Sequence, residues 1–210
     1  MAASHCTRHC AESRRDNLRS TTAYLADGWP HRGADPQVRL YRSGDDLAAV
    51  RFHFGSSVRR AGTADVRFPD APALRGYTVP ASQVQPGDEL RVDLYWGGED
   101  GAKTNLSSFV HIRNSRPNGP MNPRSGNEIW AQEEHQTPGG LLTTEYLPGK
   151  LYKDEFRVPL PEDLPPGEYF VEVGWFDPES GEQLDPQPET VQPPLKILWR
   201  SILLPSVQVQ

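Results

Sequence analysis

The side chains best suited to metal chemistry gather at the start of the chain. The chain has two cysteines, Cys6 and Cys10, and both lie beside histidines, His5 and His9. On a helix each pair would share one face, and Cys and His are ligands that zinc prefers. Four ligands packed into one short stretch would struggle to surround an ion tetrahedrally, and no second ligand pair follows. We therefore expect no metal site and no cofactor.

A second stretch, Glu133-Glu134-His135, could supply acid–base chemistry. Because neighbouring residues of a strand point to opposite faces, Glu133 and Glu134 cannot form a facing pair of carboxylates. A hydrolase would need another carboxyl group facing one of them across a cleft, roughly 5–9 Å away. The chain also lacks serine-nucleophile, phosphate-loop and dinucleotide motifs. We expect no catalytic residues, and a small hydrolase is the least favoured alternative.

The elements that would position these residues follow from a repeated turn. Pro86-Gly87, Pro148-Gly149 and Pro166-Gly167 each lead into a strand of alternating apolar residues. Proline presets φ for a turn and glycine supplies positive φ, while an alternation of period two indicates a strand with one buried face. The sequence predicts an all-β chain, an immunoglobulin-like antiparallel β-sandwich of about seven to nine strands. The main strands are expected at residues 74–79, 90–96, 107–113, 128–134, 152–160, 169–176 and 195–204.

The chain divides into three regions by composition. Residues 1–36 are expected to be a flexible N-terminal segment, with a short helix over 17–26 as one option. Residues 37–64 are expected to form a β-hairpin followed by a small, basic linker, and residues 65–204 the sandwich. The three regions together are lean in apolar residues, with 36% hydrophobic residues and a mean hydropathy of −0.66.

Charge and apolar content restrict the class of partner and the location. The formal net charge is −6, and the acidic excess lies after residue 65, which argues against nucleic acid as a partner. No apolar run is long enough for a transmembrane helix. The first residues lack the apolar segment of a signal peptide, so taken alone the sequence predicts a cytoplasmic protein.

Aromatic side chains offer both a core and a surface for sugar stacking. Trp96 and Trp175 continue buried alternations, and Tyr169 follows a Pro-Gly turn like the tyrosine corner of Greek-key sandwiches; all three are expected to be structural. Trp130 and Tyr146 lie among polar segments, so we expect them to be exposed.

A series of short motifs then falls in a characteristic order. The motifs are Gly76-Tyr77, Pro86-Gly87-Asp88-Glu89-Leu90, Leu94-Tyr95-Trp96, Phe109-Val110-His111, Gln132, Pro138-Gly139-Gly140, Pro148-Gly149, Asp154, Leu160-Pro161, Leu164-Pro165-Pro166-Gly167, Tyr169, Val173-Gly174 and Asp177-Pro178. Over about residues 66–200 this series resembles the C-terminal β-sandwich module of bacterial membrane glycosyltransferases of the dolichyl-phosphate-mannose mannosyltransferase type. The chain departs from the family pattern at Tyr146, where Trp is usual, and at Glu134, where Asp is usual.

The resemblance implies an extracytoplasmic module without transferase chemistry, and a glycan or a membrane glycosyltransferase as partner. We expect a non-catalytic accessory or binding module of cell-envelope glycan metabolism. A structural or protein-interaction sandwich without a small ligand is the alternative. The residues expected to contact a glycan, by ring stacking or by hydrogen bonds to hydroxyl groups, are His111, Trp130, Gln132, Glu134 and Tyr146.

Overall fold

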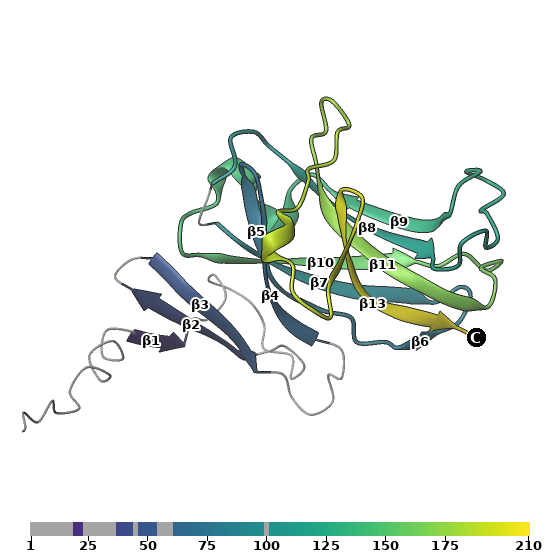
Figure 1. The fold of residues 1–210 in the computed structure, drawn as a ribbon, viewed down its shortest axis with the longest axis horizontal. Coiled ribbons are helices and arrows are strands. Elements are labelled where there is room, and N and C mark those ends of the chain that lie inside the picture. The colour runs from purple at the N-terminus through teal and green to yellow at the C-terminus, as the bar shows by residue number, and fades with distance from the viewer. Residues whose placement is uncertain (1–18, 23–36, 44–45, 54–60, 99–100) are drawn as a thin grey trace, which may run out of the picture.

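The computed structural model describes residues 19–22, 37–43, 46–53, 61–98 and 101–210 (Figure 1). Within these ranges no helix is long and apolar enough to cross a membrane. The strands are β1 Arg19–Thr22, β2 Gln37–Ser43, β3 Asp46–His53, β4 Ala61–Phe68, β5 Ala71–Thr78, β6 Gln83–Val84, β7 Glu89–Gly97, β8 Ser107–Asn114, β9 Ile129–His135, β10 Leu151–Pro159, β11 Gly167–Phe176, β12 Lys196–Leu198 and β13 Ser201–Val209. Three short 3-10 helices lie in the connections, η1 Pro138–Gly140, η2 Thr143–Glu145 and η3 Pro188–Thr190.

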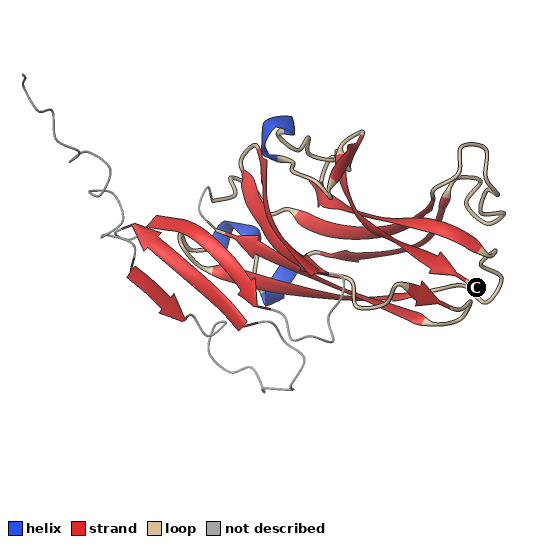
Figure 2. Cartoon of the chain, turned by 60° about the horizontal axis from the view of Figure 1, so that its bottom comes forward, coloured by secondary structure: helices blue, strands red, loops and turns tan. Residues whose placement is uncertain are grey.

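The strands from β4 onward form two layers, which confirms the predicted β-sandwich (Figure 2). One layer is a four-stranded sheet in the order β10-β7-β5-β4. The other is a six-stranded sheet in the order β12-β13-β11-β8-β9, with β6 added in parallel to β13. The other strand pairs of both layers are antiparallel. A separate three-stranded sheet, β1-β2-β3, precedes the sandwich, and its β2–β3 hairpin was predicted.

Alternation along β7 shows why these residues form a layer. Leu90, Val92, Leu94 and Trp96 are fully buried in the core between the sheets. Each fully buried Val or Leu contributes about 1.5–3 kcal/mol relative to an exposed one, so the inward face selects the register. The turn before the strand depends on Gly87, whose φ of +85° is a conformation that other residues rarely adopt.

The predicted structural aromatics are confirmed. The Trp96 and Trp175 rings pack across the interior with centroids 4.2 Å apart, and the Trp175 indole donates to the carbonyl of Pro72. The Tyr169 hydroxyl donates to the carbonyl of Pro165 over 2.9 Å, as in a tyrosine corner. The two Trp175 contacts join the two layers, and the Tyr169 bond fixes the entry of β11.

Three features differ from the sequence-based expectation. The predicted strand over 195–204 is two strands, because the chain turns back at Trp199 and Arg200 between β12 and β13. β4 was not predicted, and the expected boundary before residue 65 falls inside it. Residues 19–22 form β1 where a short helix had been one option. The Cys6–Cys10 cluster lies outside the described residues.

The edges of the two sheets meet on one side of the sandwich. β9 is an edge strand of the six-stranded sheet, and β10 is an edge strand of the four-stranded sheet. Residues 136–150 connect these two edge strands and include η1 and η2. Side chains from both layers therefore come together where β9 ends.

Candidate functional site

An open pocket of about 550 Å³ lies at this junction of the two sheets. The end of β9, the connection that follows it and the middle of β10 form its walls. Most of the lining groups can donate or accept hydrogen bonds, and none of the lining residues is Phe, Tyr or Trp. Its lining residues are Glu134, His135, Gln136, Thr137, Gly139, Gly140, Lys153, Asp154 and Glu155.

A buried carboxylate organises the pocket. Asp154 of β10 is 2% exposed, and both of its oxygens accept hydrogen bonds. Ser108 Oγ and Trp96 Nε1 donate to Oδ2 over 2.6 and 3.2 Å. His135 Nδ1 lies 2.6 Å from Oδ1, and the backbone N–H of Gly139 lies 3.4 Å from the same oxygen. Partners from both sheets and from η1 thus satisfy a charge that burial would otherwise make costly.

The hydrogen bond that His135 donates to Asp154 orients the imidazole. An ionised carboxylate only accepts, so Nδ1 is the donor and Nε2 is directed away from Asp154. The ring also stacks on Phe156, with centroids 4.1 Å apart and planes within 4°. The side chain keeps 28% exposure and borders the pocket. A ring held from two sides can present Nε2 to a ligand without losing much conformational freedom.

The pKa of His135 is raised, chiefly by its hydrogen bond to Asp154 and further by the charges of Asp154 and Glu133, against the opposing effect of burial. Stability from this pair is fully present below the pKa of unfolded His, about 6.5, and is lost as pH rises through the higher folded pKa. We expect the free energy of unfolding to fall above about pH 6.5, measured by urea denaturation across pH. In His135→Gln this decline should be absent, and an unchanged decline in the variant would contradict the assignment.

A glycine permits the close approach of η1 to β10. Gly139 has φ +64°, and a Cβ there would meet the Lys153 carbonyl oxygen at 3.0 Å and the Tyr152 Cβ at 3.1 Å. A larger residue would displace η1 from β10 and remove the Gly139 N–H from Asp154. The bare backbone therefore forms part of the pocket wall.

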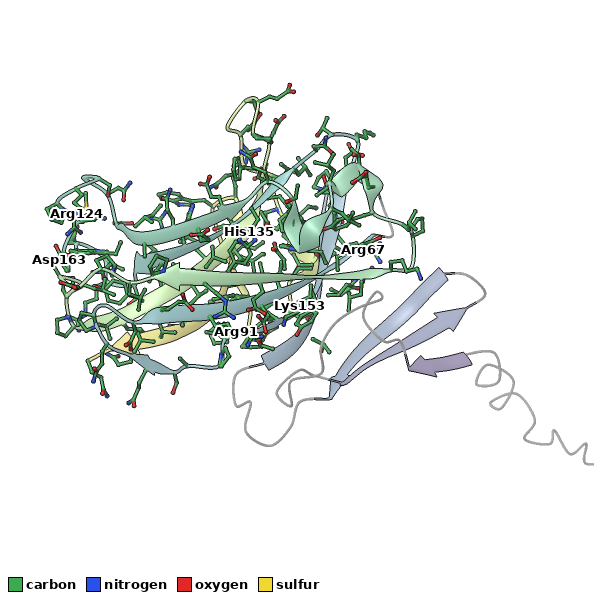
Figure 3. The ribbon with its side chains drawn as sticks, turned by 180° about the vertical axis from the view of Figure 1, so that it is seen from behind. Arg67, Arg91, Arg124, His135, Lys153 and Asp163 are labelled. Atoms are coloured by element: carbon green, nitrogen blue, oxygen red, sulfur yellow. The ribbon has the colours of Figure 1, made fainter. Side chains whose placement is uncertain are left out.

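The opposite face of β10 carries a second charged group. The Lys153 side chain is 1% exposed, with Nζ 3.5 Å from Asp93 Oδ2 and 3.2 Å from Glu155 Oε2. Arg91 bonds both of these carboxylates. Because side chains alternate along a strand, Lys153 and Asp154 point to opposite faces, and Figure 3 shows Lys153 and His135 on different sides of β10. The Lys153 ammonium group therefore pairs with Asp93 and Glu155 on the face of β10 opposite to the His135 ring.

Two of the predicted ligand-contact residues are not exposed, and that expectation was wrong. Trp130 is buried in the core, and its indole donates to the carbonyl of Pro120. Tyr146 is buried, stacks on Tyr152 at 3.8 Å and donates its hydroxyl to the carbonyl of Pro138. Burial raises the pKa of the Tyr146 hydroxyl. Neither ring offers a face to a sugar.

The other three predicted residues lie together on one face. We call the side of the six-stranded sheet that is turned away from the core the outer face. Gln132 pairs with His111, and Glu134 pairs with Phe109, so these four side chains share that face. Gln132 and Glu134 are exposed, whereas His111 is buried and stacks on Phe109.

Two residues outside the predicted ligand-contact set, Asp154 and Trp199, hold positions that suit a functional role. Asp154 occupies an inward position between Tyr152 and Phe156, and a charged residue in an apolar alternation was the signal available. Trp199, 77% exposed, was hidden inside a segment interpreted as one strand.

No family model matches this sequence, and no curated protein matches it significantly. In the described part of the chain, no group of three His, Cys, Asp or Glu side chains could hold a metal ion. The site must therefore be interpreted from its own geometry.

Proposed function

We propose that this chain is a non-catalytic binding module of cell-envelope glycan metabolism, and that the pocket beside His135 binds a sugar. The observation that carries the proposal is the imidazole fixed by Asp154 at the edge of a polar pocket. A sugar presents many hydroxyl groups that both donate and accept, which suits a lining of amide, hydroxyl, carboxylate and backbone groups. The link to the cell envelope rests on the family resemblance in the sequence.

Two of the three acids that line the pocket, Asp154 and Glu155, favour binding over hydrolysis. Both Asp154 oxygens are held by donors, and Glu155 bonds Lys153, Arg91 and Arg157. Burial would raise the pKa of Glu155, but Lys153, Arg157 and Arg91 outweigh it and lower that pKa. A general acid in a glycosidase needs a raised pKa so that it carries a proton, and these surroundings favour the opposite state.

The test is a titration of the whole chain with cell-wall sugars, followed by NMR of the backbone amides. We expect shifts in residues 134–140 and 153–155. His135→Ala should weaken binding about tenfold or more, because a hydrogen bond to a charged group is worth about 1.5–3 kcal/mol. Glu179→Ala, at an exposed position of the connection after β11, is the matched control and should bind normally.

Two results would count against the proposal. No response of the wild-type chain to any sugar at millimolar concentration would remove sugar binding. Unchanged affinity in a folded His135→Ala variant, checked by thermal unfolding, would remove the pocket as the site.

A protein-interaction role is the second candidate, and one observation favours it. Leu141, Leu142 and Leu147 lie between β9 and β10 with exposures of 40%, 37% and 58%. Exposed apolar residues that cluster on one connection are typical of a contact surface. This role predicts no amide shifts with sugars, so the same titration distinguishes the two candidates.

A further inference from the structure

Trp199 occupies an unusual position for its size. It is the first residue of the two-residue turn between β12 and β13, its φ is +53°, and it is 77% exposed. Hairpin turns with positive φ at this position normally carry glycine, and a bulky residue there is strained. Strained, exposed residues concentrate where proteins contact other molecules. A tryptophan kept in solvent at this turn therefore indicates a binding role.

One face of the Trp199 ring is already supported. The Arg113 guanidinium lies over the ring, 5.5 Å from its centroid. Such a cation–π contact restrains the indole while leaving its other face to solvent. The ring is thus held in place before any ligand arrives, which lowers the entropic cost of stacking.

Two ion pairs fix Arg113 in turn, and the one with Glu172 is buried. Its Nε bonds Glu172 Oε2 at 2.8 Å, and its NH1 bonds Glu128 Oε2 at 2.9 Å. Ser201 Oγ donates to Glu172 Oε1 over 2.7 Å. His111 Nδ1 lies 3.8 Å from Glu172 Oε2. Burial would raise the pKa of Glu172, but His111, Arg113 and Ser201 lower it to about 2, so this anchor stays charged.

Polar side chains connect Trp199 with the pocket. Arg113, Gln132 and Glu134 lie on the outer face, and Glu134 also lines the pocket beside His135. The carbonyl oxygen of Arg200, in the same turn as Trp199, would lie 3.7 Å from a Cβ on Gly174. Gly174 pairs with Phe109 and Phe109 pairs with Glu134, so the turn and Glu134 lie three strand spacings apart across the sheet, or roughly 14 Å. A ligand that touched both ends would have to be extended.

We infer that the ligand is an oligosaccharide, with one sugar in the pocket and another stacked on Trp199. The inference rests on the proposed function and deepens it. The apolar face of a sugar ring packs on an indole, and the exposed Gln132 and Glu134 side chains can bond hydroxyl groups of the units between. Trp199 thus takes the stacking role that the buried Trp130 and Tyr146 cannot fill.

The experiment compares Trp199→Gly with the wild type. Glycine suits the positive φ, so the turn should keep its geometry when the ring is removed. The probes are N-acetylglucosamine, glucose and mannose, each as the monosaccharide and as a linear tetrasaccharide, titrated by calorimetry. We expect unchanged affinity for the monosaccharides and about tenfold weaker binding of the preferred tetrasaccharide. Met121→Ala, at another exposed apolar residue, is the control and should change neither.

A second readout follows the indole N–H of Trp199 by NMR, assigned by its absence in Trp199→Gly. This signal should shift with the tetrasaccharide and remain in place with the monosaccharide. Equal affinity of the wild type and Trp199→Gly for every tetrasaccharide would overturn the inference while leaving the pocket intact. Failure of all sugars to bind the wild type would overturn the proposed function itself.

Discussion

Replacing Asp154 with alanine is expected to destabilise the sandwich by about 3–5 kcal/mol, the usual cost of removing one partner from a buried ionic group. Ser108 and Trp96 would each keep a buried donor without its acceptor, and the bond from β9 to β10 through His135 would be lost. The measurement is urea denaturation followed by tryptophan fluorescence. Because Asp154 joins both sheets, the loss should increase the unfolding rate of the whole sandwich.

Asp163→Ala is the matched control. Asp163 pairs with Arg124 at 3.0 Å, but both side chains are about half exposed or more, at the far end of the molecule (Figure 3). Removing an exposed pair costs about 0–1 kcal/mol. Equal effects of Asp163→Ala and Asp154→Ala would contradict the organising role of Asp154.

The variant Asp154→Asn distinguishes the effect of the negative charge of Asp154 from the effect of its side-chain shape. The amide keeps the volume of the side chain, but it removes the negative charge that raises the pKa of His135. We expect the His135 titration, followed by NMR of its ring protons, to move toward the ordinary value of about 6.5. The sugar affinity of the pocket should fall as well, since the imidazole is no longer held by an ionised partner.

Replacing Glu172 with glutamine is expected to have the second large effect, also about 3–5 kcal/mol. The Arg113 guanidinium is mostly buried, and in the variant its remaining carboxylate partner is the more exposed Glu128. The exposed Glu189 provides the control, because Glu189→Gln should change stability by less than about 0.5 kcal/mol.

The pH dependence of the free energy of unfolding is expected to show the contribution of the Glu172 carboxylate. The folded pKa of Glu172 is lowered to about 2, so its contribution is present above the unfolded value and is lost as pH falls through the folded value. Between about pH 4 and pH 2 the wild type should therefore lose stability more steeply than Glu172→Gln. Parallel curves in this window would show that Glu172 is not the titrating group.

Glu172→Gln should also weaken tetrasaccharide binding at Trp199, because Arg113 loses its buried partner and no longer holds the indole ring in place.

Much of the fold could be predicted from local patterns. The alternation through Leu94 and Trp96, and that through Val173 and Trp175, correctly marked core strands, because period two places every second side chain on one face. The same alternation does not predict the burial of Trp130. A register shift between Ile112 and Arg113 lies opposite it, so Trp130 and its neighbour Ala131 are both buried.

The candidate site was harder to predict because it lies in connections. Tyr146 stands in a segment without periodicity, and it is buried only because that segment folds back onto Tyr152. The turn at Trp199 lacks the glycine that marks a hairpin, so the local pattern predicts one strand where the structure has two. Patterns along the chain could not show either contact.

The amino-acid sequence by itself determined the layers of this protein, since turn residues and alternation depend on near neighbours and on the face that must avoid water. It also contained a buried acid, an imidazole and an exposed indole, but with no indication of their partners. Tertiary structure decided those partners. His135 meets Asp154 only because the edges of the two sheets adjoin, and Trp199 meets Arg113 only because the last hairpin turns toward the outer face. Contacts between residues distant in sequence depend on packing, which no local pattern encodes.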